Sequence, residues 1–289
     1  MRCSAPAIRS SAAGSGAGST ISSLGRVSPY PGTIVDMSPI EPDPALVDAA
    51  RTAGRVVVFS GAGMSAESGV PTFRDALTGL WQRFDPTELA TPQAWERDPE
   101  LVWAWYEWRS ALVRRVQPNA GHRAVADWAR FAEVAVVTQN VDDLHERAGS
   151  DVAAHLHGSL FAPRCSACGT AAHVDVGPDR VPVERLSPPE CAACGAAVRP
   201  GVVWFGEQLP QAVWEVAERA VEGCDLMVVV GTSGMVYPAA ELPARAAASG
   251  ATVVEINPEP TELTAVATHS WRATAAEALP ALVAACASS

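Results

Sequence analysis

Short apolar runs alternate along this chain with segments of helical character, and this alternation restricts the possible folds strongly. The runs are five or six residues long, and several are rich in valine, which is typical of strands buried in a parallel sheet. They lie at 55–60, 133–138, 153–157, 226–231 and 252–256, with helices expected at 45–53, 99–116, 121–130, 141–148, 211–222 and 239–249. The pattern predicts an α/β fold built on a doubly wound parallel sheet.

Two insertions interrupt the alternation and predict a second, smaller lobe. Residues 70–117 are helical in pattern and rich in tryptophan, and residues 161–201 contain four cysteines and several prolines. The large lobe is then expected to comprise 44–69, 118–160 and 202–285, in a catalytic domain spanning 44–285. A chain of 289 residues, 48% of them hydrophobic, is large enough for both parts. Residues 1–40 are rich in serine, alanine and glycine and are expected to be a disordered extension or a mis-assigned start, with Met37 as the alternative start.

Charge and hydropathy exclude some classes of partner. The formal net charge is −11, which argues against a nucleic-acid-binding surface, and all 21 basic residues are arginine. No stretch approaches the ~20 apolar residues of a membrane span, and there is no secretory signal. The expectation is therefore a cytoplasmic protein that binds neither nucleic acid nor membrane. The sequence leaves its oligomeric state open.

Four cysteines form two CxxC pairs, Cys165 with Cys168 and Cys191 with Cys194. This spacing is typical of a four-cysteine zinc knuckle, and a glycine follows each pair where the chain must turn back. Two disulfides or a redox pair are the alternatives, but a redox site needs only one pair. With four thiolates the coordination shell is closed, so we expect one structural Zn²⁺ that does not activate water.

A glycine-rich turn follows the first expected strand. Residues 55–60 run directly into Gly61-Ala62-Gly63, which allows backbone N–H groups to approach a pyrophosphate at the start of a helix. The third glycine of the usual dinucleotide fingerprint is replaced by Ala66, so the motif alone is weak, and a strand–turn–helix without ligand is the alternative.

Polar residues end the later strands, where a doubly wound sheet binds its ligand. They form the segments 138–143, 155–159, 231–233 and 257–259. Most are small polar, acidic, amide or imidazole groups, which suit hydrogen bonds to ribose and carboxamide groups.

Taken together, these motifs resemble the sirtuin family of NAD-dependent protein lysine deacylases, from about Arg55 to about Leu279. The resemblance rests on GAGMSAESGVPTFRD (61–75), TQNVDDLH (138–145), LHGS (156–159), the two CxxC pairs, VVWFGE (202–207), VGTS (230–233) and EINPEP (255–260). It implies a Rossmann-like sheet with a helical and zinc-binding lobe, NAD as co-substrate, and acyl-lysine proteins as substrates.

The resemblance also implies roles for individual residues. The residues expected to bind NAD are Gly61, Ala62, Gly63, Ser65, Phe73, Arg74, Gln139, Asn140, Asp142, Gly231, Thr232, Ser233, Asn257, Glu259 and Ala275. Asn257 and Glu259 fall around the adenosine, and Ala275 falls where the family closes over the adenine. His157 matches the catalytic base, and Asn140 is the second residue expected to be catalytic.

The family's chemistry explains these residue types. The acyl-lysine carbonyl oxygen attacks the ribose carbon as nicotinamide leaves, and a neutral imidazole then helps a ribose hydroxyl attack the resulting imidate. The products are free lysine, nicotinamide and O-acyl-ADP-ribose. A histidine with a pKa near ~6.5 is mostly neutral at neutral pH, which suits the base. By contrast, His155 and His145 are expected to be structural.

A tyrosine and an arginine in the first insertion suggest a narrower substrate class. Asp98 and Pro99 start the helix expected at 99–116, so Tyr106 and Arg109 lie on one helical face. From spacing alone a solvated arginine would be favoured. However, the resemblance extends to sirtuins that remove malonyl and succinyl groups with this Tyr-x-x-Arg pair, and it places Ala90 on the acyl-pocket wall. We therefore expect desuccinylase and demalonylase activity beside deacetylase activity.

Substrate peptide is expected to pair as an added strand with the segment 202–207, and Val203 is the expected acyl-channel contact. Two other functions remain possible at this point. An ADP-ribosyltransferase would use the same NAD site, and a non-enzymatic NAD sensor would not need Asn140, Asp142 and His157 together. A dehydrogenase is disfavoured because no acidic residue follows a second strand at the usual distance.

Overall fold

The computed structural model describes residues 41–72 and 79–287. Phe73 and Arg74, which the resemblance assigns to the cofactor site, lie outside the described residues. Within that part of the chain no helix is long and apolar enough to cross a membrane.

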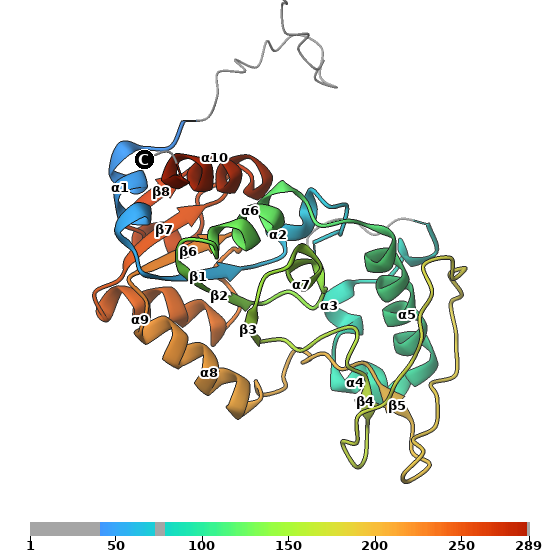
Figure 1. The fold of residues 1–289 in the computed structure, drawn as a ribbon. Helices are drawn as coiled ribbons and strands as arrows, with labels where there is room; N and C mark the ends of the chain where they lie inside the picture. The colour runs from blue at the N-terminus through green and yellow to red at the C-terminus, as the bar shows by residue number, and fades with distance from the viewer. Residues whose placement is uncertain (1–40, 73–78, 288–289) are drawn as a thin grey trace, which may run out of the picture. The chain divides into compact units, whose positions relative to one another are not determined.

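A parallel sheet organises the described residues (Figure 1), with the strand order β3-β2-β1-β6-β7-β8. Every neighbouring pair of these strands is parallel, which confirms the predicted sheet. The strands are β1 (Arg55–Ser60), β2 (Glu133–Thr138), β3 (Val152–His155), β6 (Leu226–Val230), β7 (Thr252–Ile256) and β8 (His269–Trp271).

Two details of the predicted strands are wrong. β3 ends at His155, so His157 lies in the following turn and not on the strand, because the chain turns at Leu156 to bring Gly158 against Val202. The edge strand β8 was not predicted, since its three residues include no apolar run.

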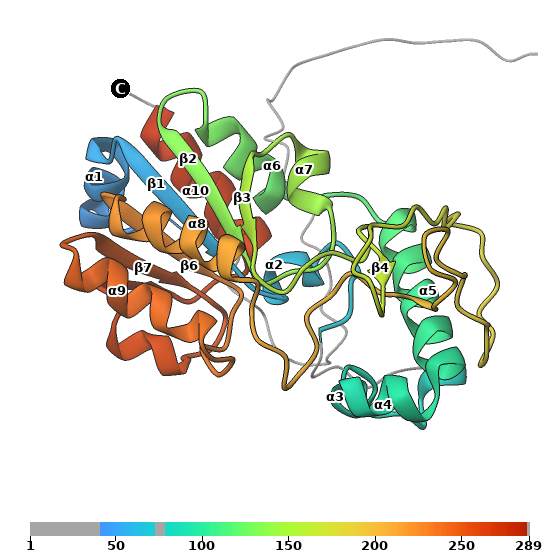
Figure 2. The same ribbon diagram turned by 90° about the horizontal axis from the view of Figure 1, so that it is seen from below.

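Helices cover both faces of the sheet (Figure 2), and the alternation of side chains along β1 explains why. Val56 and Val58 pack in one buried cluster with α1 (Pro44–Thr52), α6 (Ala120–Trp128) and α10 (Ala275–Ala287). Val57 and Phe59 pack in another with α8 (Gln211–Glu222) and α9 (Leu242–Ala248). Because successive strand residues point to opposite faces, a run that is apolar throughout requires such two-sided cover.

Two predicted helices differ in their bounds. The helix expected at 141–148 begins only at Leu144, as α7 (Leu144–Ala148), because the Asp142 carboxylate accepts the Leu144 N–H in the preceding turn. The helix expected at 239–249 is divided into a 3-10 turn, η2 (Ala239–Glu241), and α9.

The two insertions pack against each other (Figure 2). The first contains η1 (Gly79–Trp81), α3 (Pro86–Leu89), α4 (Pro92–Arg97) and α5 (Pro99–Arg115). Asp98 caps α5 as predicted, accepting the Leu101 N–H. The second forms the hairpin β4 (Arg164–Cys165) and β5 (Val198–Arg199), and Trp103 of α5 packs in one cluster with its cysteines.

Candidate active site

Several strands end at one edge of the sheet, and the loops that follow them form the candidate active site. The chain runs outward from β1 to β2 and β3, then places β6 on the other side of β1. The strand order therefore reverses between β1 and β6. In doubly wound sheets the crevice at such a reversal is where ligands bind.

The loops after β1 and β6 touch each other through glycines. Gly63 N–H donates to the Gly231 carbonyl at 2.8 Å, and a Cβ at Gly63 would lie 2.8 Å from Gly231 Cα. Gly231 has a φ of +62°, and a Cβ there would lie 2.3 Å from Met64 N. Both positions therefore exclude a side chain for packing reasons alone, in addition to the phosphate approach that the sequence suggests.

Ser65, Asn140 and Asp142 form a buried polar group behind these loops. Ser65 Oγ donates to Asp142 Oδ2 at 2.9 Å, and Asn140 Nδ2 donates to Ser65 Oγ at 3.2 Å. Burial raises the pKa of Asp142, against the hydrogen bonds from Leu144 and Ser65. Three residues that the sequence analysis assigned to the cofactor site are thus brought together from two segments of the chain.

Gln139 and Asn257 connect further loops to Thr232. Gln139 Nε2 donates to Thr232 Oγ1 at 2.9 Å, and Asn257 Nδ2 donates to the Thr232 carbonyl at 3.0 Å. Ser233 follows half-buried, while Glu259 is exposed. The ends of β2, β6 and β7 are therefore linked by side chains at the predicted positions.

Ala275 begins α10 and is buried. The next backbone N–H, that of Ala276, donates to Glu67 Oε2 at 2.9 Å, just beyond α2 (Gly63–Ala66). The start of α10 thus lies against the segment that follows the glycine-rich turn.

Hydrogen bonds hold both the backbone and the ring of His157. Its Nδ1 lies 3.0 Å from the Gln139 carbonyl, which can only accept, so Nδ1 carries the proton and Nε2 carries the lone pair. Burial lowers the pKa of His157, against the opposing effect of this hydrogen bond. The His157 carbonyl accepts the Val203 N–H at 2.8 Å. The ring is therefore neutral at neutral pH, with its orientation fixed.

His155 binds the next carbonyl of the same turn. Its Nδ1 lies 3.0 Å from the Asn140 carbonyl, and its Nε2 lies 2.6 Å from Glu146 Oε1. Burial alone would lower the pKa of His155, but the hydrogen bonds with Glu146 and the Asn140 carbonyl and the charges of Glu146 and Asp142 together outweigh it, so the pKa rises. His157 and His155 thus bind the successive carbonyls of Gln139 and Asn140. Their pKa values shift in opposite directions, and only His155 has a carboxylate partner.

Trp204 of the segment 202–207 contacts Tyr106 of the first insertion. The Trp204 indole Nε1–H donates to Tyr106 Oη at 3.1 Å, and the tyrosine is only 5% exposed. Burial raises the pKa of Tyr106, so the phenol stays protonated. Because the oxygen accepts from the indole, the phenol proton is left to donate in another direction.

Arg109 lies near Tyr106 and near Asp142 of the buried polar group. Its guanidinium is 5.0 Å from the Trp105 ring centroid, and burial lowers its pKa while Tyr106 and Asp142 act in the opposite direction. Arg109 also lines a hollow together with Val70 and Thr72. An arginine keeps its charge in such a setting.

Ala90 and Val203 flank the same region. The Ala90 carbonyl accepts the Phe205 N–H at 2.9 Å, and Ala90 is buried. Val203 is half-buried; its own N–H donates to the His157 carbonyl, and the next residue, Trp204, donates to Tyr106.

An ion pair that the sequence did not indicate holds the segment 202–207. Arg199 donates to both oxygens of Glu207, at 2.6 and 2.9 Å, and its guanidinium lies 3.4 Å from the Trp204 ring centroid. Glu207 Oε2 also accepts the Trp204 N–H at 2.8 Å. No local pattern predicts Arg199, because its role depends on how β5 approaches the segment 202–207.

The four cysteines of the predicted zinc site lie together. Their Sγ atoms are all within 4.8 Å of one another, with the closest contacts at 3.4, 3.6 and 3.8 Å. Sulfurs bound at about 2.3 Å to one tetrahedral ion would be about 3.8 Å apart, so the group fits zinc.

Two buried histidines below the site predict how stability depends on pH. His122 and His145 have ring centroids 4.8 Å apart, and burial lowers their pKa values to about 4 and about 3 from 6.5. The unfolded chain takes up protons below pH 6.5 and the folded chain does not, so acid favours unfolding. We expect the free energy of unfolding to fall by roughly 2 kcal/mol per pH unit between pH 6.5 and 4 from these two groups.

Urea unfolding at several pH values measures this slope. In His122→Gln the slope should decrease by about half, or about 1 kcal/mol per pH unit. An unchanged slope in the variant would contradict the assignment. His173→Gln, at an exposed position, is the control.

Comparisons with known proteins agree with this site. The Sir2 family matches residues 61–238. The NAD-dependent protein deacylase 2 of Corynebacterium efficiens is 55% identical over 240 residues, covering 82% of this chain and 94% of the relative. An NAD-dependent protein deacylase of Mycobacterium tuberculosis is 57% identical over 230 residues, covering 79% and 96%.

Among solved structures, the complex of a Sir2 homologue with NAD superposes with a TM-score of 0.79 at 45% identity, covering 86% of this chain and 95% of that one. The sheet, the reversal point with its polar loops and these matches lead to one conclusion: this chain belongs to the Sir2 family.

Proposed function

We propose that this protein removes acyl groups from protein lysines in an NAD-dependent reaction, giving nicotinamide, O-acyl-ADP-ribose and free lysine. The observation that carries the proposal is His157, a neutral imidazole whose tautomer is fixed by the Gln139 carbonyl, while the side chain of Gln139 bonds to Thr232 at the reversal point of the sheet. The relatives from Corynebacterium and Mycobacterium are named NAD-dependent protein deacylases, and they match most of this chain.

The donor set at the strand ends fits a dinucleotide. The loops after β1 and β6 approach each other without side chains, and amide, hydroxyl and carboxyl groups gather around them. Gly61, Ala62, Gly63 and Ser65 are proposed to hold the phosphates, and Gln139, Asn140 and Asp142 the nicotinamide ribose and carboxamide. Gly231, Thr232 and Ser233 would lie near the phosphates and the adenosine ribose, with Asn257, Glu259 and Ala275 around the adenosine. When bound, NAD supplies the activated ribose carbon and the leaving nicotinamide.

His157 is proposed to accept a proton at Nε2. The Gln139 carbonyl fixes the proton on Nδ1, so the lone pair on Nε2 is available in the resting state. Burial keeps the ring neutral, as a general base requires. Asn140 is proposed to act beside it, held by Thr138 Oγ1 and Ser65.

The four cysteines are proposed to hold one structural Zn²⁺. Their sulfur distances fit a tetrahedral ion, and a four-thiolate shell leaves no open position for water. The ion would stabilise the hairpin that packs against Trp103 of α5.

The segment 202–207 is proposed to bind the substrate peptide. The N–H groups of Val203, Trp204 and Phe205 donate within the protein, to His157, Glu207 and Ala90. A substrate strand would therefore donate its own N–H groups to carbonyls of this segment.

Tyr106 and Arg109 are proposed to recognise an acidic acyl chain. The indole of Trp204 leaves the phenol proton of Tyr106 to donate to an acyl carboxylate, and Arg109 supplies the positive charge. Ala90 leaves room on the pocket wall, and Val203 is the proposed contact with the acyl stem.

Replacing Arg109 tests this proposal. Arg109→Met should lower kcat/KM for a succinyl-lysine peptide by roughly 10- to 100-fold, because a charge-assisted hydrogen bond is lost. Activity on the matched acetyl-lysine peptide should change less than about threefold. Arg115→Met, at an exposed position of the same helix, is the control. An equal loss of kcat/KM on both peptides would show that Arg109 does not recognise the charge of the acyl group.

Mass spectrometry of both peptides, incubated with and without NAD, tests the function itself. NAD-dependent appearance of O-acyl-ADP-ribose is the expected result. ADP-ribose attached to protein, without deacylation, would instead indicate a transferase. A cytoplasmic location stays part of this proposal.

A further inference from the structure

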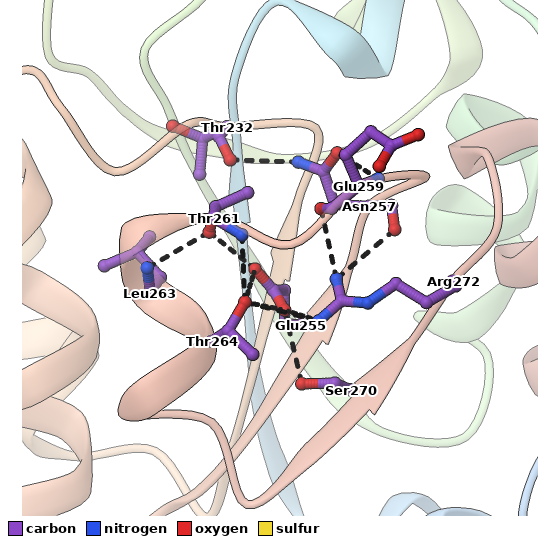
Figure 3. A network of polar contacts seen from close by, with 9 residues as sticks. All are labelled: Thr232, Glu255, Asn257, Glu259, Thr261, Leu263, Thr264, Ser270 and Arg272. Atoms are coloured by element: carbon purple, nitrogen blue, oxygen red, sulfur yellow. Dashed lines mark hydrogen bonds and ion pairs between the residues drawn. The ribbon is translucent and has the colours of Figure 1, made fainter.

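A buried carboxylate and an arginine, neither of them in the predicted cofactor set, hold the loop that follows β7. Figure 3 shows this polar network, which joins the end of β7 to the loop with Asn257 and Glu259 and to the end of β8. Because that loop lies at the carboxyl edge of the sheet, its shape bears on ligand binding.

Glu255 is the centre of the network and is 1% exposed. Its carboxylate accepts hydrogen bonds from Thr261 at 2.5 Å, Thr264 at 2.8 and 3.0 Å, and Ser270 at 3.2 Å. Arg272 Nη2 forms an ion pair with it at 2.7 Å. Burial alone would raise the pKa of Glu255, but these donors outweigh it, so the carboxylate is charged.

Arg272 extends the network to the loop backbone. Its Nη1 donates to the carbonyls of Asn257 at 3.4 Å and Glu259 at 3.2 Å, and its Nη2 donates to Thr264 Oγ1 at 3.2 Å. One guanidinium therefore bonds at once to the buried carboxylate and to two carbonyls of the loop (Figure 3).

The loop is fixed on its other side through Asn257. The amide of Asn257 donates to the Thr232 carbonyl at 3.0 Å, and its Oδ1 lies 3.5 Å from the Glu259 N–H. A shift of the two carbonyls held by Arg272 would thus move the side chains proposed to bind adenosine.

We propose that Glu255 and Arg272 are positioning residues that hold Asn257 and Glu259 in place for the adenosine end of the dinucleotide. The inference rests on the proposed function. A role confined to folding would predict changes in stability without a selective change in the affinity for the adenosine end.

The substitution Arg272→Lys separates the two roles. Lysine keeps a positive charge beside Glu255, but its single ammonium cannot reproduce the planar fork that spans the carboxylate and two carbonyls. Stability should therefore be largely kept while the loop is released.

Titration calorimetry with ADP-ribose measures the effect without turnover. We expect Arg272→Lys and Glu255→Gln each to weaken ADP-ribose binding about tenfold, as for the loss of one net hydrogen bond. The KM for NAD should rise by a similar factor, while kcat and the KM for the acyl peptide stay within about twofold. In the double variant the losses should not add, because both act through one network.

Arg55→Lys is the matched control, since Arg55 pairs with Asp225 at 3.5 Å at the opposite edge of the sheet. Unchanged ADP-ribose affinity in both network variants, or an equal loss in the control, would overturn the inference. If the wild-type protein bound no ADP-ribose and released no acyl group, the proposed function itself would fail.

Discussion

His157→Ala is expected to lose deacylation by roughly 10²- to 10⁴-fold in kcat, the range for removal of a general base. The imidazole is neutral, and the Gln139 carbonyl fixes its tautomer. In the family's sequence of steps the base acts after nicotinamide has left. Exchange of labelled nicotinamide into NAD should therefore survive in the variant when an acyl peptide is present.

Steady-state rates and the exchange reaction can be measured on the same preparation. Retained exchange would show that the variant is folded and binds both substrates. His173→Ala, at an exposed position, should behave as the wild type. Deacylation within tenfold of the wild type would remove His157 from the role of base.

Loss of a zinc thiolate is expected to have the largest effect on stability. Metal binding at structural zinc sites contributes to folding directly, by about 10–16 kcal/mol in small zinc peptides. In a chain of this size, loss of zinc should disturb only the packing of the hairpin against α5, so only part of that free energy should be lost. We expect Cys191→Ser to lower the unfolding midpoint by roughly 10 °C or more, since each kcal/mol shifts it by about 2–4 °C.

Elemental analysis should give one zinc per wild-type chain and much less in Cys191→Ser. Cys286→Ala removes a buried thiol outside the group and should keep the metal. A wild-type protein without zinc, whose four cysteines failed to react with a thiol reagent until reduced, would indicate disulfides instead.

The strands and the zinc group could be predicted because their signals are local. Val56, Val57, Val58 and Phe59 are apolar in succession, which requires a strand covered on both faces. The two CxxC pairs each place two thiolates on one tight turn, with Gly169 and Gly195 at positive φ.

The predictions were wrong where a contact made in the folded chain overrides the local pattern. The segment 141–143 reads as helix, but the Asp142 carboxylate bonds to the Leu144 N–H and to Ser65, so the helix starts later. The three residues of β8 form a strand only because the edge of β7 is available for pairing.

The sequence by itself determined the sheet, the glycine-rich turn, the cysteine group and the family resemblance, because strand period and turn chemistry act over a few residues. Only the tertiary structure decided that Trp204 donates to Tyr106, 98 positions away. It also decided that Arg272 joins Glu255 to the loop after β7. Such contacts depend on which strands become neighbours and how closely their loops approach, and no short stretch of sequence encodes that arrangement.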